Sequence, residues 1–222
     1  MPNSYGRILN DRAHAHAHHG DCDSNHGHDE DPALRDSLFS KVNTEFMTCL
    51  NEKNGYSGAE ILKPFDQRMD MTKFLESDSD KEFMLHVPFT GMVKLKSIVV
   101  WGGPGNCAPK NMKLIVNRQD VDFTNVHNTL PTQEIDLVQG SNAPVEYALR
   151  ASKFSNVSTL NLHFNGNFSD CEDDEIQLFY IAFYGEFFEV NTSPVVAVYE
   201  SRPNFADHIQ RTKIDFSLNH IH

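Results

Sequence analysis

The most regular feature of the chain is an alternation of apolar and other residues over residues 83–89 and 93–101. Successive side chains of a β-strand point to opposite faces, so this period of two predicts two strands, each with one buried face. Thr90–Gly91 predicts a turn between them. In the second strand, the buried face is expected to hold the odd-numbered residues Val93, Leu95, Ser97, Val99 and Trp101. Lys94 and Lys96 are expected on the opposite face, with their ammonium groups in water.

Further strand-like segments follow, separated by clusters of Asn, Gly and Pro. They cover residues 112–116, 135–137, 145–149, 160–164, 176–184 and 195–199. The segment that ends before Gly185 is apolar at successive positions, as expected for a strand covered on both sides. Short strands without the spacing of βαβ units predict an all-β fold, an antiparallel β-sandwich or jelly roll.

Ahead of the strands, a spacing of four residues links several apolar positions, namely Leu34, Leu38, Val42, Phe46 and Leu50. This spacing predicts either one amphipathic helix or a loosely helical packing segment. The pattern changes to alternation after Gly55 and Gly58.

The pattern divides the chain into three parts. Residues 1–33 are rich in His, Asp, Gly and Ser and nearly devoid of aliphatic residues. They cannot bury enough apolar surface to offset the entropy of ordering, so we expect a disordered tail. Residues 34–190 are expected to form one domain, and residues 191–222 a flexible C-terminal extension.

Charge and hydropathy narrow the classes of partner. The formal net charge of −12 disfavours nucleic-acid binding, which draws its affinity from clustered Lys and Arg. No apolar run approaches the ~18 residues of a membrane span, and the first residues lack the apolar segment of a signal peptide. We therefore expect a protein of the cytosol or nucleus that binds neither nucleic acid nor membranes. We also expect a monomer.

The N-terminal tail carries a dense set of possible metal ligands. These are His14, His16, His18, His19, His26 and His28. Neutral imidazoles on a flexible chain can gather around Zn, Ni or Cu without a preformed site. The competing interpretation is a soluble low-complexity tail, and the domain itself is expected to need no cofactor.

Candidate partner-binding residues lie in an acidic run and at the C-terminus. They are Glu172, Asp173, Asp174, Glu175, His220 and His222. The acidic run lacks the D-x-[DN]-x-[DN]-G pattern of a calcium loop, and is either a solvated turn or a docking site for a basic surface. The terminal imidazoles are either solvated or able to fill a groove or ligate a metal on a partner.

Nothing in the sequence points to catalysis. It contains no G-x-S-x-G, H-E-x-x-H or phosphate-loop motif. The cysteines at positions 22, 49, 107 and 171 form no CxxC pair, which excludes thioredoxin-type chemistry. Cys107 has no evident cationic neighbour to activate its thiol, and Cys49 is interpreted as a small packed residue. We predict that the chain is not an enzyme and has no catalytic residues.

Short motifs along the chain resemble those of the PITH domain, in the same order. The first half contains CLNE at 49–52, FLESDSD at 74–80, VPF at 87–89 and VKL at 93–95. The second half contains GP at 103–104, AP at 108–109, DF at 122–123, PTQ at 131–133 and KFSNV at 153–157. The resemblance covers residues 34–190 and rests on the order of these motifs.

The resemblance implies a galactose-binding-like β-sandwich. In fused members of the family, this domain attaches a thioredoxin domain to the regulatory particle of the 26S proteasome. The thioredoxin half is absent here, and residues 199–208 resemble the segment after the domain in standalone members. We therefore expect a non-enzymatic interaction module, a proteasome-associated adaptor or regulatory factor. The alternatives are a carbohydrate-binding jelly roll, for which the only tryptophan, Trp101, offers no evident stacking platform, and a cytosolic or nuclear regulator without proteasome contact.

Overall fold

The computed structural model describes residues 7–8, 36–55, 57–169 and 175–189. Its strands are β1 (Arg7–Ile8), β2 (Thr48–Leu50), β3 (Leu75–Glu76), β4 (Glu82–Trp101), β5 (Pro109–Val116), β6 (Gln133–Asp136), β7 (Val145–Ala148), β8 (Val157–Asn167), β9 (Gln177–Leu178) and β10 (Tyr180–Phe188). The helical turns are η1 (Phe39–Lys41), η2 (Thr44–Phe46), α2 (Ser57–Glu60) and η3 (Phe65–Gln67). The predicted all-β class is confirmed.

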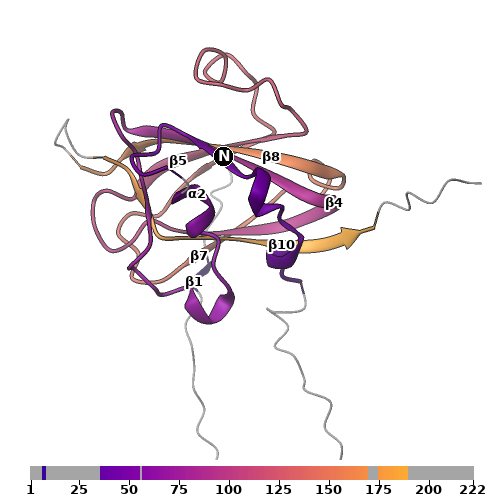
Figure 1. The fold of residues 1–222 in the computed structure, drawn as a ribbon, viewed down its shortest axis with the longest axis horizontal. Helices are drawn as coiled ribbons and strands as arrows, with labels where there is room; N and C mark the ends of the chain where they lie inside the picture. Colours follow the sequence, from indigo (N-terminus) through magenta and orange to yellow (C-terminus); the bar gives the residue numbers. More distant parts are fainter. Residues whose placement is uncertain (1–6, 9–35, 56, 170–174, 190–222) are drawn as a thin grey trace, which may run out of the picture. The chain divides into compact units, whose positions relative to one another are not determined.

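The long strand β4 belongs to both layers of a sandwich. Its first part, residues 82–88, pairs with β8 and β2, and β8 continues to β5 and β6. Its last part, residues 92–101, pairs with β10 and β7, and β7 continues to β1. All these pairs are antiparallel, and Figure 1 shows the layer of β8 and β5 above the layer of β10 and β7. The predicted antiparallel β-sandwich is therefore confirmed.

The turn predicted at Thr90–Gly91 is wrong, because β4 runs unbroken through these residues. The pairing of β4 with β8 shifts register between Pro88 and Val93, where the strand passes from one layer to the other. A Cβ atom at Gly91 would lie 2.9 Å from the ring of Phe187. Gly91 is thus needed for the close approach of an aromatic ring.

A β-bulge at Lys96 reverses the two faces of β4. On β10, Tyr184 pairs with Ser97 and Gly185 pairs with Leu95, so Lys96 is the extra residue. Before the bulge the odd-numbered residues point into the core, and after it the even-numbered residues do. A single extra residue is enough to exchange the faces, because side chains alternate with a period of two.

The prediction that Ser97, Val99 and Trp101 share the core face with Val93 and Leu95 is therefore wrong. Ile98 and Val100 occupy the core beyond the bulge. Val99 and Trp101 lie on the outer face, where they pack in a separate cluster with Phe74, Phe179, Tyr180, Ala182 and Tyr184.

The helix considered for residues 34–50 is also wrong over the described part of that segment. Residues 36–50 form two single 3₁₀ turns and the strand β2, and they pair with the sheet through Ser37–Tyr184 and Val42–Phe89 bridges. Leu38 and Val42 are buried as the spacing predicted, but Phe46 is 66% exposed. The alternative of a loosely helical packing segment is closer to the structure.

The apolar run at 176–184 is divided between β9 and β10, and β10 continues through Gly185 to Phe188. Between the two layers lies the main core, in which the rings of Phe83 and Phe164 are 4.9 Å apart. The strand candidate at 195–199 lies outside the described residues.

Candidate functional site

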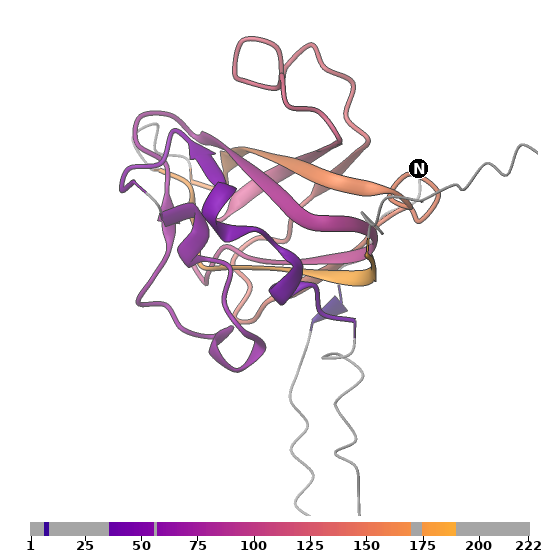
Figure 2. The ribbon, with the colours of Figure 1, turned by 45° about the vertical axis from the view of Figure 1, so that its right-hand side comes forward.

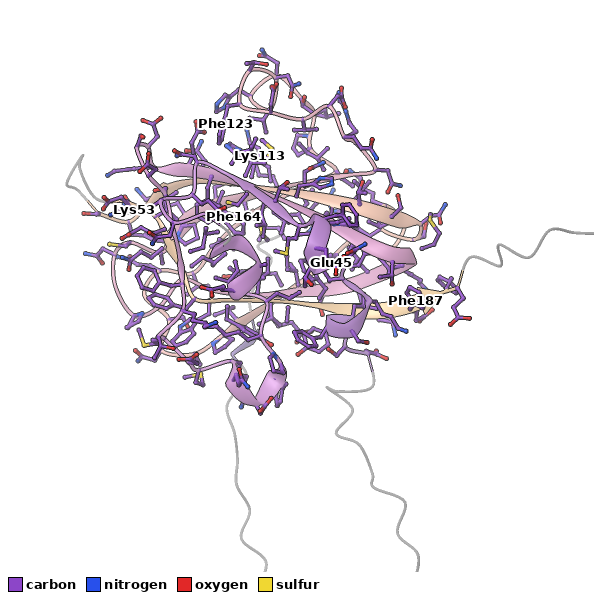
Figure 3. All side chains as sticks on the ribbon, viewed as in Figure 1. Glu45, Lys53, Lys113, Phe123, Phe164 and Phe187 are labelled. Atoms are coloured by element: carbon purple, nitrogen blue, oxygen red, sulfur yellow. The ribbon has the colours of Figure 1, made fainter. Side chains whose placement is uncertain are left out.

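The connection between β5 and β6, residues 117–132, covers the outer face of the layer that contains β8. It rises above that layer in Figures 1 and 2. Val121 and Val126 of this segment pack on Met84 and Ile115 of the sheet, with Phe123 at the edge of the cluster. Figure 3 shows Phe123 and Lys113 on this side of the sheet and Phe164 between the layers. We call residues 117–132 the covering loop.

Local hydrogen bonds give the covering loop its shape. The carboxylate of Asp122 accepts hydrogen bonds from the backbone N–H groups of Thr124 and Asn125 and from the Thr124 hydroxyl. Asp and Ser/Thr side chains commonly stabilise turns in this way. The backbone N–H and the hydroxyl of Thr129 both donate to the carbonyl oxygen of Asn125, 2.9 Å away in each case. The turn that results carries His127.

The covering loop brings His127 to two polar residues of the sheet. Glu82 begins β4, and His163 lies on the neighbouring strand β8, opposite Met84. The Nε2 atom of His163 is 2.9 Å from Oε2 of Glu82, and the Nε2 atom of His127 is 3.6 Å from the same oxygen. One ligand-type atom from each of the three residues lies within 4.8 Å of the others. We call these residues the His–Glu–His cluster.

The cluster passes from the protein interior to solvent. His163 is fully buried, Glu82 is partly buried, and the side chain of His127 is 51% exposed. Burial lowers the pKa of His163, while the hydrogen bond and charge of Glu82 act in the opposite direction. The ring is therefore held neutral, with an Nε2–H group that donates to the Glu82 carboxylate. Its Nδ1 atom is buried without a hydrogen-bond partner.

A second candidate surface surrounds the strand β2, which the described chain pairs with β4 alone. Phe46 and Leu50, at 66% and 41% exposure, stand on either side of Thr48 along this segment. Thr48 lines two pockets. The larger has a volume of about 500 Å³ and is also lined by Glu45, Met47 and Glu52. The smaller has a volume of about 300 Å³ and is also lined by Leu50. We call Phe46, Thr48, Leu50 and these two pockets the β2 surface.

A model of the PITH domain matches residues 28–203. The chain belongs to the PITH domain family. Curated relatives include PITH domain-containing protein 1 of Homo sapiens, 35% identical over 201 residues that cover 88% of this chain and 93% of the relative. PITH domain-containing protein CG6153 of Drosophila melanogaster is 36% identical over 204 residues, 89% and 94% of the two chains. The resemblance drawn from the sequence motifs is confirmed, and membership suggests a protein-interaction module.

Solved structures with a partial likeness to this chain include carbohydrate-binding modules. The third family 32 module of a family 31 glycoside hydrolase from Clostridium perfringens has a TM-score of 0.49 and 10% identity, covering 71% of this chain and 99% of that one. The second module of that enzyme type, solved with GalNAc, has a TM-score of 0.42 and 12% identity, covering 65% and 99%. At TM-scores below 0.5, these likenesses assign neither a superfamily nor a ligand to this chain.

Most site residues expected from the sequence fall outside the described part of this PITH domain. The histidines of the N-terminal tail lie there, as do Glu172, Asp173, Asp174, His220 and His222. Glu175 is described, and its carboxylate lies 3.4 Å from the ammonium of Lys53, which also contacts Glu76 at 3.1 Å. A role for these residues in binding a partner or a metal stays a prediction.

Two other sequence-based expectations concern Trp101 and Cys49. Trp101 is buried, and its indole N–H donates to the carbonyl of Ser141, so it offers no face for stacking on a sugar. Burial, and then the charge of Glu52, raise the pKa of the Cys49 thiol, which keeps it protonated and weakly nucleophilic. No helix in the described ranges is long and apolar enough to cross a membrane.

Sequence reasoning did not find the His–Glu–His cluster. His163 alternates with the core residues Leu162 and Phe164, which predicts a solvent-facing position. Phe123 and His127 of the covering loop pack against its ring, and the apolar residues Val121 and Val126 were the signal in the sequence that this loop packs on the sheet. Loop packing of this kind depends on tertiary contacts, which no local period encodes.

Proposed function

We propose that this PITH domain is a non-enzymatic adaptor that binds a subunit of the 26S proteasome regulatory particle through its β2 surface. The proposal places the protein in the cytoplasm and nucleus, where proteasomes operate. The observation that carries it is a short edge strand that borders two pockets and has exposed apolar side chains beside it at Phe46 and within it at Leu50. The choice of partner rests on kinship with family members that attach thioredoxin to the regulatory particle.

The β2 surface has the composition of a docking site. Exposed aromatic and aliphatic side chains near pockets supply much of the energy of protein interfaces. Phe46 is such an aromatic residue, and Leu50 lines the smaller pocket. An edge strand can in addition accept a strand from a partner through backbone hydrogen bonds.

The charge of the β2 surface specifies the partner further. The larger pocket is lined by the carboxylates Glu45 and Glu52, and neither pocket is lined by Lys or Arg. Charge complementarity increases association rates and excludes wrong partners. We therefore expect the bound segment to carry apolar residues flanked by Lys or Arg.

Two of the three described histidines, His86 and His163, are bonded in a way that favours a non-catalytic role. His86 bonds to the side-chain amide of Asn161 through Nδ1, and His163 bonds to Glu82. A general base must reach the hydroxyl or thiol of a nucleophile. These imidazoles instead face amide and carboxyl oxygens.

The test is affinity purification of the tagged full chain from cell lysate, followed by mass spectrometry. We expect proteasome subunits with the unaltered chain and their loss, by at least about tenfold, when Phe46→Ala and Leu50→Ala are combined. Leu130→Ala is the matched control, because Leu130 is also apolar and 90% exposed but belongs to the covering loop. This variant should retain the subunits.

Each contrary result removes a different part of the proposal. No proteasome subunits with the unaltered chain would remove the partner and favour a regulator that acts without proteasome contact. Equal capture by the Phe46/Leu50 variant and the control would remove the β2 surface. Loss of capture in His220→Ala/His222→Ala alone would transfer docking to the C-terminal extension.

A further inference from the structure

We propose that Glu82, His127 and His163 form a binding site for a divalent transition metal, Zn²⁺ above all, which fastens the covering loop to the sheet. The three residues come from β4, the covering loop and β8. Two imidazole nitrogens and a carboxylate oxygen are a ligand set that zinc takes in proteins. The site is independent of the β2 surface and of the proposed adaptor role.

The distances are compatible with one metal ion bound by all three residues, in which case the proton of the neutral His163 ring moves from Nε2 to Nδ1 and leaves Nε2 free to bind the ion. Ligand atoms bound to zinc at about 2.0–2.1 Å in tetrahedral directions lie about 3.4 Å from one another. The separations of Glu82 Oε2 from His163 Nε2 and His127 Nε2 are 2.9 Å and 3.6 Å, one on each side of that value. The longer separation exceeds a good N–H···O hydrogen bond, so hydrogen bonding explains the place of His163 but not that of His127.

The burial of the ligands also suits an ion. His163 is fixed within β8 and fully buried, and Glu82 is fixed at the start of β4. The exposed side of His127 leaves a path for the ion, and solvent water can supply a fourth ligand.

Two features limit the affinity. The Nδ1 atom of His163 lacks a hydrogen-bond partner, whereas zinc-bound histidines nearly always donate from their second nitrogen to an acceptor. Loss of such a partner typically weakens metal binding by about 10–100-fold. Lys113 of β5 lies opposite His163 in the sheet, and its positive charge repels a metal cation bound at His163. We therefore expect a dissociation constant of about 1–10 μM, rather than that of a structural zinc finger.

The remaining histidines must be removed as competitors before binding is measured. The sequence has 12 histidines, and only His86, His127 and His163 lie within the described residues. The test therefore uses the full chain in which all histidines except His86, His127 and His163 are replaced by Gln. Co²⁺ is titrated into this parent protein, its visible absorption bands report nitrogen and oxygen ligands, and Zn²⁺ is then added to displace it.

We expect one equivalent of Co²⁺ to bind the parent and to be displaced by Zn²⁺. His127→Gln and Glu82→Gln should each weaken binding by at least about tenfold. His86→Gln is the matched control, because His86 lies on the same face of β4 but bonds to Asn161, and it should leave binding unchanged. Circular dichroism verifies that the variants are folded, and the exposed side chain of His127 makes that substitution compatible with folding.

A second measurement tests the fastening of the loop. Zn²⁺ should raise the Tm of the parent and slow proteolysis within residues 117–132, and it should do neither in His127→Gln. If the parent neither binds Co²⁺ nor shows a Zn²⁺-induced rise in Tm at about 0.1 mM metal, roughly tenfold above the expected dissociation constant, or binds Co²⁺ as well after His127→Gln, the proposal is overturned. The cluster is then a hydrogen-bonded His163–Glu82 pair with His127 beside it.

Discussion

Gly185 shows how a single residue can determine the pairing of two strands. A Cβ atom at this position would lie 2.1 Å from the carbonyl oxygen of Lys94 and 3.1 Å from the Cα of Leu95. Both are backbone atoms on either side of the Lys94–Leu95 peptide, next to the bulge, so no flexible side chain can move aside. We predict that Gly185→Ala destabilises the fold by about 3 kcal/mol, at the upper end of overpacking effects.

Urea unfolding of the purified chain measures this free energy directly. Gly55→Ala is the matched control, since a Cβ atom at Gly55 meets nothing within 4 Å. It should change the stability by less than about 0.5 kcal/mol. Equal midpoints for the two variants would mean that the bulge can relax around an added methyl group.

The thiol of Cys49 provides a second prediction at the scale of the residue. Because burial raises its pKa, with a smaller contribution from Glu52, the reactive thiolate is scarce at pH 8. We expect iodoacetamide to modify Cys49 at least about 100-fold more slowly in the folded chain than in denaturant. Glu52→Gln should accelerate the reaction only slightly. Mass spectrometry of the peptide that contains Cys49 measures the rate of modification. Rapid modification of Cys49 in the folded chain would show that its thiol is accessible and not held protonated by burial.

Lys63 organises the segment between α2 and β3. Its side chain is almost fully buried, and its ammonium donates to the carbonyl oxygens of Asp70 and Lys73, both 2.7 Å away. Lys63→Met would leave both carbonyls without this donor. We predict a loss of about 1–3 kcal/mol in unfolding free energy and faster hydrogen exchange over residues 64–74.

The control for Lys63 is Lys153, whose ammonium also donates to a carbonyl oxygen, that of Thr132, but at an exposed position. Lys153→Met should cost less than about 0.5 kcal/mol. If the two variants have the same stability, the buried ammonium contributes no more than a surface contact.

At the scale of elements, the alternation of apolar residues was sufficient to predict the all-β fold and the places of most strands. It failed where a strand changes partner. The bulge at Lys96 exists because β10 approaches the backbone closely at Gly185, a contact between segments far apart in the sequence. The spacing of Leu38 and Val42 likewise reflects two positions that face the core, and backbone pairing with Tyr184 and Phe89 overrides helix formation there.

For the whole molecule, the continuity of β4 has a thermodynamic consequence. Residues 82–88 and 92–101 of this strand each pair on both sides within one layer, and the main core lies between the layers with contributions from both. Neither layer can lose β4 while the other keeps its core. We therefore predict that residues 36–189 unfold in a single cooperative transition.

Trp101 makes this prediction measurable, because the only tryptophan lies in the layer of β10 and β7. Its fluorescence and the far-UV circular dichroism of all strands should give the same urea midpoint. Phe164→Leu, in β8 of the other layer, should shift both midpoints equally, although Phe164 lies on a different strand and layer from Trp101. A fluorescence midpoint that stays in place while the dichroism midpoint falls would show that the layers unfold separately, and that β4 bends at Pro88–Met92 without coupling them.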